Sequence, residues 1–167
     1  MRMMLTFTPI TQHKAGIIAS LLLQSYAEIL SAEQQYWLQE EENWLQFDRE
    51  VFENPDTIGR CVFITSWEEK TIGLGSFDPR QKPEFGIIGH NCIVPQFRGH
   101  GYGKQQILEI LNRLGELKIK RAIVSTSEHP FFLPAQKMYL SCGFEESKRY
   151  IGGPDPRYRL IEYSKNL

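Results

Sequence analysis

The feature that most restricts the fold is a pattern of strand, glycine loop, helix and strand in the second half of the chain. Residues 84–94 form an apolar run that ends at Pro95, which lacks the N–H that a central strand needs. Gly99, Gly101 and Gly103 follow at alternate positions, and after them come an amphipathic helical pattern and the β-rich run 121–127. Because the helix must pack back onto one face of the sheet, we expect the two strands to lie parallel and adjacent.

The rest of the sequence also mixes helical and strand patterns, without repeats or a linker between domains. Residues 3–10 alternate like a short strand, and Thr11 can cap a first helix whose apolar positions extend to Leu30. Ser31 and Gln34 have capping-box spacing for a second helix, which should end at Asn54. Strands at 60–67 and 71–77, a short helix at 134–143 and a terminal hairpin around 152–156 complete the predicted order.

Length, charge and cysteine content narrow the class of protein. A chain of 167 residues suits a single domain, which we place over residues 1–167. The formal net charge of −1 gives no general attraction to nucleic acid or to an anionic membrane. The apolar stretches are far shorter than the roughly 20 residues that span a bilayer, and the N-terminus has no signal-peptide core. Three cysteines leave one unpaired, which fits a reducing, cytoplasmic location, and the histidines show no metal-ligand spacing.

The glycine loop is suited to bind an anion. Glycines let backbone N–H groups approach a ligand closely, and the first N–H groups of a helix have no partner within it. The helix dipole adds partial positive charge at the same point, and Arg98 and Lys104 add full charges. The sequence therefore predicts a phosphate or pyrophosphate site at the start of this helix.

Two familiar phosphate loops do not match. A P-loop requires G-x-x-x-x-G-K-[ST], but Arg98 and Gln105 stand at two of its fixed positions. A dinucleotide fingerprint requires G-x-G-x-x-G, whereas these glycines are spaced G-x-G-x-G and no acidic residue ends the run 121–127. A different phosphate-binding pattern is needed.

The loop does match [QR]-x-x-G-x-[GA], through Arg98, Gly101 and Gly103. A second pattern, A-x-x-[hydrophobic]-Y-x-x-x-G-F, is matched by Ala135, Met138, Tyr139, Gly143 and Phe144. Together the two patterns resemble the GNAT superfamily of acetyl-CoA-dependent N-acetyltransferases, and the order of elements extends the resemblance over nearly the whole chain. It implies an α/β (α+β) fold with a mixed, mostly antiparallel sheet of six to seven strands. That sheet would be splayed between its fourth and fifth strands and flanked by about four helices.

The resemblance implies that acetyl-CoA, the co-substrate, lies in the gap between the strands 84–94 and 121–127. Backbone groups of Cys92, Ile93 and Val94 would pair with its pantetheine arm as an added strand does. The pyrophosphate would lie on the loop made of Arg98, Gly99, His100, Gly101, Tyr102, Gly103 and Lys104. An amine would then attack the thioester directly, through an oxyanion stabilised by N–H donors and without a metal.

This sequence matches the family's general-acid position but has no carboxylate at its general-base position. Tyr139 stands where the family has an acid that protonates the CoA thiolate, although on spacing alone a tyrosine of a short amphipathic helix is a packing residue. The family's base is often a carboxylate near 88–90, and this chain has Ile88, Gly89 and His90 there. His90, with an ordinary pKa near 6.5, is either the base or a histidine held by a cross-strand partner.

Several other side chains are candidates near the expected cleft. Glu84, at the start of the strand, is either an alternative base or a solvated surface residue. Glu128 and His129 stand beside the expected cleft mouth, where a histidine is typically a cap or a surface residue. Phe132 occupies a position where many family members have an asparagine that contacts CoA. The segment 129–134 would then pack against CoA or fill the core.

The resemblance places the acceptor pocket between the first two helices and the terminal hairpin. Aromatic residues at 28–47 together with Glu40, Glu41 and Glu42 would suit a cationic amine. The same acidic run is also typical of a solvated helix face, and aromatic residues at helical spacing are typical of a core.

Two hypotheses of different kinds follow. The first is an N-acetyltransferase that acts on a primary amine of a small molecule, or else on a peptide or protein amine, with a homodimer allowed. The second is a CoA-binding sensor or regulatory module without catalysis, which the missing carboxylate and Phe132 keep open. A third hypothesis, a nucleotide-binding reductase, predicts binding of NAD(P)H in place of CoA. Turnover distinguishes the first hypothesis from the second.

Overall fold

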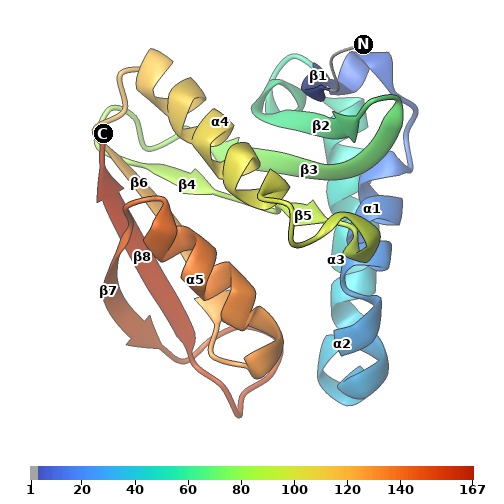
Figure 1. Ribbon diagram of the computed structural model, residues 1–167, viewed down its shortest axis with the longest axis vertical. Coiled ribbons are helices and arrows are strands. Elements are labelled where there is room, and N and C mark those ends of the chain that lie inside the picture. The colour runs from blue at the N-terminus through green and yellow to red at the C-terminus, as the bar shows by residue number, and fades with distance from the viewer. Residues whose placement is uncertain (1–3) are drawn as a thin grey trace.

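The computed structural model describes residues 4–167. Its helices and strands are, in chain order, β1 (Leu5–Pro9), α1 (Ile17–Ser25), α2 (Ala27–Ala32), α3 (Gln34–Glu53), β2 (Val62–Trp67), β3 (Lys70–Asp78), β4 (Gly86–Ile88), β5 (Cys92–Ile93), α4 (Tyr102–Glu116), β6 (Arg121–Ser127), α5 (Leu133–Ser141), β7 (Glu145–Tyr150) and β8 (Leu160–Asn166) (Figure 1). The sheet has the order β1-β2-β3-β4-β6-β8-β7, with β5 also paired to β3. All pairings are antiparallel except that of β4 with β6, so the predicted fold class is confirmed. Within the described residues the sheet has eight strands and is accompanied by five α-helices, slightly more than predicted.

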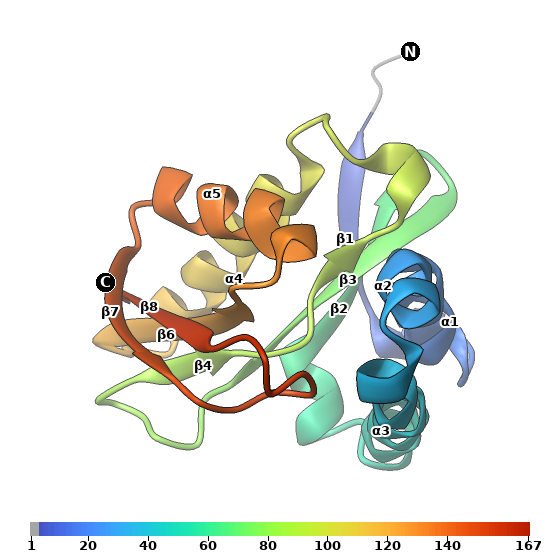
Figure 2. The ribbon, with the colours of Figure 1, turned by 90° about the horizontal axis from the view of Figure 1, so that it is seen from below.

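The core is divided between the two faces of the sheet by the alternation of strand residues. Ile64 and Leu74 are buried among the apolar side chains of α1 and α3. Phe63 points to the opposite face and is buried with Ile107 and Ile110 of α4. Figure 2 shows the result: α1 and α3 lie on one side of β1–β3, and α4 and α5 lie on the other. None of the helices in this described part combines the length and the apolar character that a membrane crossing requires.

The sheet splays because the predicted strand 84–94, which was expected to pair with the strand 121–127, is interrupted. Ile88 pairs with Phe77, but Cys92 pairs with Leu74, so four residue steps are matched to three on β3. The extra residue is a β-bulge at 89–91, which breaks the predicted continuous strand 84–94 into β4 and β5. β4 pairs in parallel with β6 at positions 86–87, as predicted, whereas β5 pairs with β3. The gap between β5 and β6 therefore opens at the predicted place.

Two predicted helix starts are wrong, and a tertiary contact explains the first. Thr11 lies in a short 3₁₀ turn, and α1 begins after Gly16, whose φ is +102°. The Asp48 carboxylate of α3 accepts hydrogen bonds from the N–H groups of Gly16 (2.8 Å) and Ala19 (3.0 Å), so the cap comes from another helix. Ser31 lies inside α2 and does not cap α3.

Other predicted boundaries are confirmed. Asn54 follows the last residue of α3, and its side-chain amide donates to the carbonyl of Glu50 at 2.8 Å. Gly143, with a φ of +91°, lies just beyond α5 in the left-handed region that glycine tolerates best. The terminal hairpin is present as β7 and β8, and the predicted first strand is found as β1, apart from Met3, which lies outside the described residues.

Candidate active site

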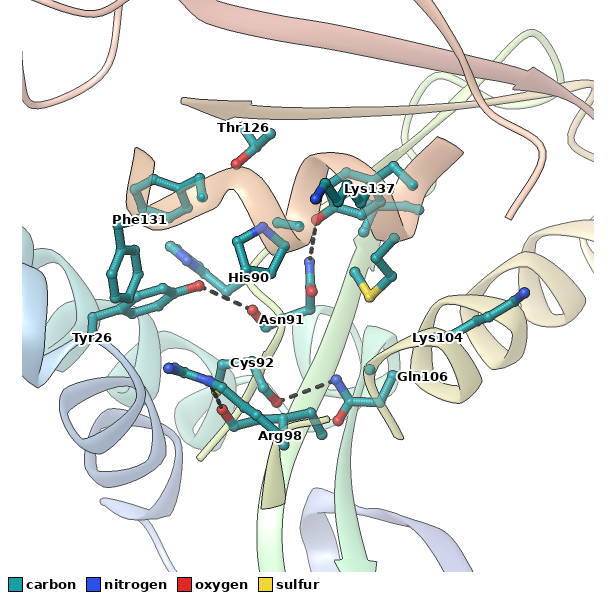
Figure 3. A pocket seen from close by; sticks show the side chains of 18 of the residues that line it. Tyr26, His90, Asn91, Cys92, Arg98, Lys104, Gln106, Thr126, Phe131 and Lys137 are labelled. Atoms are coloured by element: carbon teal, nitrogen blue, oxygen red, sulfur yellow. Dashed lines mark hydrogen bonds between the residues drawn. The ribbon is translucent and has the colours of Figure 1, made fainter. Parts of the chain in front are cut away.

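A cavity of about 830 Å³ lies in the gap between β5 and β6. Its walls come from the loop before α4, from α5, from Tyr26 at the break between α1 and α2, and from the turn between β7 and β8 (Figure 3). Elements from both halves of the chain therefore meet at one site. A ligand placed there would contact the glycine loop and the bulge 89–91 together.

The glycine loop has the geometry of an anion site. Gly99 and Gly101 both have a φ of +82°, in the left-handed region, and Gly101 is the residue before the first turn of α4. The backbone N–H groups of that first turn have no acceptor within the helix. A Cβ at Gly103 would come within 3.0 Å of the Met138 sulfur, so a glycine there lets α4 pack closely against α5. Gly99, Gly101, Tyr102, Gly103 and Lys104, which the sequence predicts to hold a pyrophosphate, all line the cavity.

Arg98 also lines the cavity, but its side chain is used differently from the prediction. Its Nε donates to the carbonyl of Ile93 at 3.0 Å, and its guanidinium also donates to the carbonyl of Ser25 at the end of α1. Its backbone N–H donates to the carbonyl of Pro95. Arg98 therefore joins the loop to β5 and α1.

Two other predicted CoA contacts lie outside the cavity lining. Val94 is buried, and its N–H donates to the carbonyl of Ile72 at 2.8 Å, within the β3–β5 ladder. His100 is exposed and stacks against Tyr102, with ring centroids 5.5 Å apart. The prediction concerned backbone groups of these two residues, and the N–H of Val94 is already used in the pairing with β3.

The edge of β5 presents backbone groups to the cavity. Because antiparallel pairs alternate, the bonded pair formed by Val94 and Ile72 leaves the N–H and C=O of Ile93 directed away from β3, toward the gap. The buried side chain of Gln106 supports this strand: its Nε2 donates to the carbonyl of Cys92 at 3.2 Å and its Oε1 accepts from Thr65 at 2.5 Å. Burial raises the pKa of the Cys92 thiol to about 11, so it stays protonated at neutral pH.

Tyr139 is connected to the bulge through Asn91. The Tyr139 hydroxyl accepts a hydrogen bond from Asn91 Nδ2 at 3.3 Å, and the same Nδ2 donates to the carbonyl of Gly89 at 3.1 Å. The hydroxyl of Tyr26 donates to the carbonyl of Asn91 at 3.1 Å. Burial raises the pKa of Tyr139 above its ordinary value, so the hydroxyl carries its proton throughout the neutral range. Sequence reasoning missed Asn91 and Tyr26, because Asn91 reaches Tyr139 only through the bulge and Tyr26 reaches Asn91 only through the packing of the first two helices beside β5.

His90 lies in the cavity, whereas Glu84 does not. The His90 ring packs against Phe47 of α3, with centroids 4.7 Å apart, and burial lowers its pKa below the ordinary value of 6.5. Its ring is therefore neutral at pH 7 and able to accept a proton. The Glu84 side chain is 70% exposed and pairs with Lys120 Nζ at 3.2 Å in a surface turn. The structure does not bring Glu84 to the site, and we do not retain it as a base.

The residues at the cleft mouth are structural. His129 Nδ1 accepts a hydrogen bond from the N–H of Phe131 at 3.0 Å, which makes His129 a cap. Glu128 is bound by Arg149 and Arg159, and their hydrogen bonds lower its pKa to about 2. Glu40, Glu41 and Glu42 lie outside the cavity lining, with Glu42 paired to Arg49 on the same helix.

Phe132, which replaces the family's asparagine, belongs to an aromatic group in the cavity wall. Its ring stacks on Trp37 of α3 with centroids 5.5 Å apart, and Phe131 and Tyr26 lie beside it. Trp44, by contrast, is only 2% exposed and belongs to the core. On α3, Trp37 therefore lines the cavity and Trp44 belongs to the core, so the pocket interpretation fits the first residue and the core interpretation fits the second.

Comparisons with known proteins agree with this geometry. A model of the acetyltransferase (GNAT) family matches residues 23–144, which include both sequence patterns. No curated protein sequence matches the chain significantly.

Solved structures show the same fold. A protein from Desulfovibrio desulfuricans assigned to the GNAT acetyltransferases has a TM-score of 0.76 at 11% identity, over 99% of each chain. The microcin C7 self-immunity acetyltransferase MccE, in complex with acetyl-CoA and AMP, has a TM-score of 0.70 at 17% identity, over 98% of this chain and 92% of that one. The NatC complex bound to Gag peptide and CoA gives 0.64 at 15% identity, over 98% of each chain. At these identities the likeness establishes the fold alone.

Proposed function

The chain belongs to the acetyltransferase (GNAT) family and is therefore an acetyl-CoA-dependent acyltransferase, and we propose that it acetylates a primary amine of a small molecule by direct attack in a ternary complex. One observation carries the proposal. A single cavity joins the start of α4, the edge of β5 that faces away from β3 and the side chain of Tyr139. These groups are suited, in that order, to hold a pyrophosphate, a pantetheine arm and a leaving thiolate.

Binding of acetyl-CoA follows from the backbone geometry. The first-turn N–H groups of α4 would hold the pyrophosphate, with Lys104 supplying positive charge beside them. The pantetheine arm would lie along the edge of β5 that faces away from β3, as an added strand does, and one of its N–H groups would donate to the second lone pair of the Ile93 carbonyl, which also accepts from Arg98 Nε. This places the thioester near the bulge 89–91. We assign the N–H of Ile93 as a donor to the oxyanion that forms at the acetyl carbonyl.

The transfer needs one proton removed and one supplied. The amine nitrogen attacks the acetyl carbon, the carbonyl electrons move to oxygen, and their return expels the CoA thiolate as the C–S bond breaks. Tyr139 donates its hydroxyl proton to that thiolate, while the proton of the attacking nitrogen passes to His90 or to water. Because Asn91 donates to the Tyr139 oxygen, the hydroxyl proton is left free to point toward the leaving sulfur. Cys92, held as a thiol, is not suited to carry the acetyl group.

Calorimetric titration and thiol release test the proposal together. The protein would be titrated with acetyl-CoA, CoA and NADPH, and then assayed for CoA release against polyamines, amino acids, aminoglycosides, peptides and simple amines. We expect binding of both CoA species, none of NADPH, and thiol release with one class of amine. Binding of NADPH in place of acetyl-CoA would contradict the assignment of the glycine loop.

The sensor hypothesis remains the second candidate, because Phe132 replaces the asparagine that family members use and is packed into an aromatic wall. A sensor would bind acetyl-CoA and CoA without releasing thiol for any amine. Thiol release above the rate of spontaneous hydrolysis, dependent on an added amine, would reject it.

A further inference from the structure

Aromatic rings wall the part of the cavity that lies across from Lys104 (Figure 3). They come from Tyr26 at the break between α1 and α2, from Trp37 on α3, and from Phe131 and Phe132 just before α5. Neighbouring rings lie 4.9 to 6.4 Å apart between centroids, so each ring packs against the next. The Tyr26 hydroxyl donates to the carbonyl of Asn91, so this wall adjoins the bulge 89–91 near which the proposed function places the thioester.

The charged side chains in the cavity lining are Arg98, Lys104 and Lys137, all of them cations. The guanidinium of Arg98 lies 5.8 Å from the centre of the Phe131 ring, so one cation already contacts the aromatic wall. This cation is fixed by its bonds to the carbonyls of Ile93 and Ser25. A second positive charge on the substrate would meet it with like-charge repulsion.

The carboxylates near the aromatic end of the cavity are already bound by arginine side chains. Asp155 follows the lining residue Pro154 and is buried, and Arg157 binds its Oδ2 at 2.8 Å. Arg157 also binds Glu33, at the junction of α2 and α3. Glu128 follows the lining residue Ser127 and is bound by Arg149 and Arg159. Each carboxylate therefore has a partner that a substrate ammonium would have to displace.

From this wall and this charge distribution we propose that the acceptor is a primary amine on an aromatic or aliphatic body that carries no second positive charge. The inference rests on the proposed acetyltransferase function and names its substrate class. An uncharged body gains from burial against the rings, whereas a second ammonium group would lose its water without gaining a counter-ion. Polyamines and aminoglycosides are therefore poor acceptors.

The same environment helps the reacting nitrogen. Desolvation lowers the pKa of an amine, because it disfavours the charged form, and nearby cations act in the same direction. A larger fraction of the bound amine is then the free base that attacks the thioester. A neutral His90 or a water molecule suffices to take the proton released after attack.

A pair of isosteric amines tests the substrate class. n-Hexylamine and 1,5-diaminopentane have the same length and differ only in replacing a terminal methyl group by an ammonium group. We expect kcat/KM to be at least about tenfold higher for n-hexylamine, and 2-phenylethylamine to be accepted as well. Equal values, or a preference for the diamine, would overturn the inference while leaving the acetyltransferase function intact. Tight acetyl-CoA binding without release by any amine would instead overturn the function itself.

A charge placed in the wall supplies a second test. Phe132→Asp puts a carboxylate among the rings, and Leu133→Asp puts the same charge on the next residue, whose side chain is exposed and outside the cavity lining. We expect Phe132→Asp to shift the ratio of the two kcat/KM values toward the diamine by about tenfold, and Leu133→Asp to leave it unchanged. Ser125→Asp, at an exposed lining position of β6, repeats the test if the first variant loses acetyl-CoA binding or melts early. An unchanged ratio in a folded, CoA-binding variant would contradict the inference.

Discussion

Replacing Tyr139 by Phe separates its catalytic role from its packing role. The variant keeps the ring, which is 4% exposed, so it creates no cavity. It removes one hydrogen bond, from Asn91 Nδ2 to the hydroxyl at 3.3 Å, while Nδ2 keeps its bond to Gly89 at 3.1 Å. The expected loss of stability is about 1 kcal/mol, or roughly 2–4 °C in Tm. Loss of a general acid should lower kcat by about 100-fold, equivalent to about 2.7 kcal/mol in the transition state.

The catalytic effect should therefore exceed the effect on stability, and the two can be measured separately. Thiol release gives kcat and KM, calorimetry gives the acetyl-CoA affinity, and thermal unfolding gives Tm. Tyr163→Phe is a matched control: this tyrosine is 3% exposed, its ring lies 5.8 Å from that of Tyr139, and it is outside the cavity lining. Its kcat should stay within about twofold of the parent. If Tyr139→Phe keeps kcat within threefold while Tm falls, Tyr139 is a packing residue and the acid assignment is wrong.

The remaining predictions concern the loop, the support of β5 and the base. Gly101→Asp should abolish acetyl-CoA binding in calorimetry, because it puts an anion and a side chain at a φ of +82° where the pyrophosphate would lie; Gly115→Asp, at the other end of α4, should bind normally. Gln106→Met should lower the free energy of unfolding in urea by about 2–4 kcal/mol, because the Cys92 carbonyl and the Thr65 hydroxyl lose a buried partner; a change below 1 kcal/mol would refute this. His90→Phe keeps the packing against Phe47 and should lower kcat/KM by about 100-fold at pH 7 if His90 is the base. Because burial lowers the pKa of His90, the kcat/KM of the parent protein should hold somewhat below pH 6.5 and then fall as the ring is protonated. The variant should not show this fall of kcat/KM at acidic pH.

Much of the site could be predicted because its residues are close in the sequence. The three glycines, the helix that follows them and the pattern around Tyr139 depend on local backbone preference and fixed spacing, which a single sequence displays directly. Gly101 precedes α4 and Gly103 lies in its first turn, and α5 ends where Gly143 indicates. The parallel pairing of β4 with β6 also follows locally, since one helix connects the two strands.

The rest was decided by contacts between distant segments. Asp48 caps α1 from 29 and 32 residues away, so no local signal marks that helix start. The bulge at 89–91 exists because β4 and β5 both pair with β3 in registers that differ by one residue, and it brings Asn91 to Tyr139, 48 residues away.

The sequence by itself therefore determined the order of elements, the glycine loop and the family resemblance, because these rest on the properties of neighbouring residues. Only the tertiary structure decided that Glu84 lies outside the cavity, that Arg98 joins the loop to α1, and that Phe132 belongs to an aromatic wall. The physical reason is that strand register and side-chain direction are set by packing and hydrogen bonds between segments far apart in the chain.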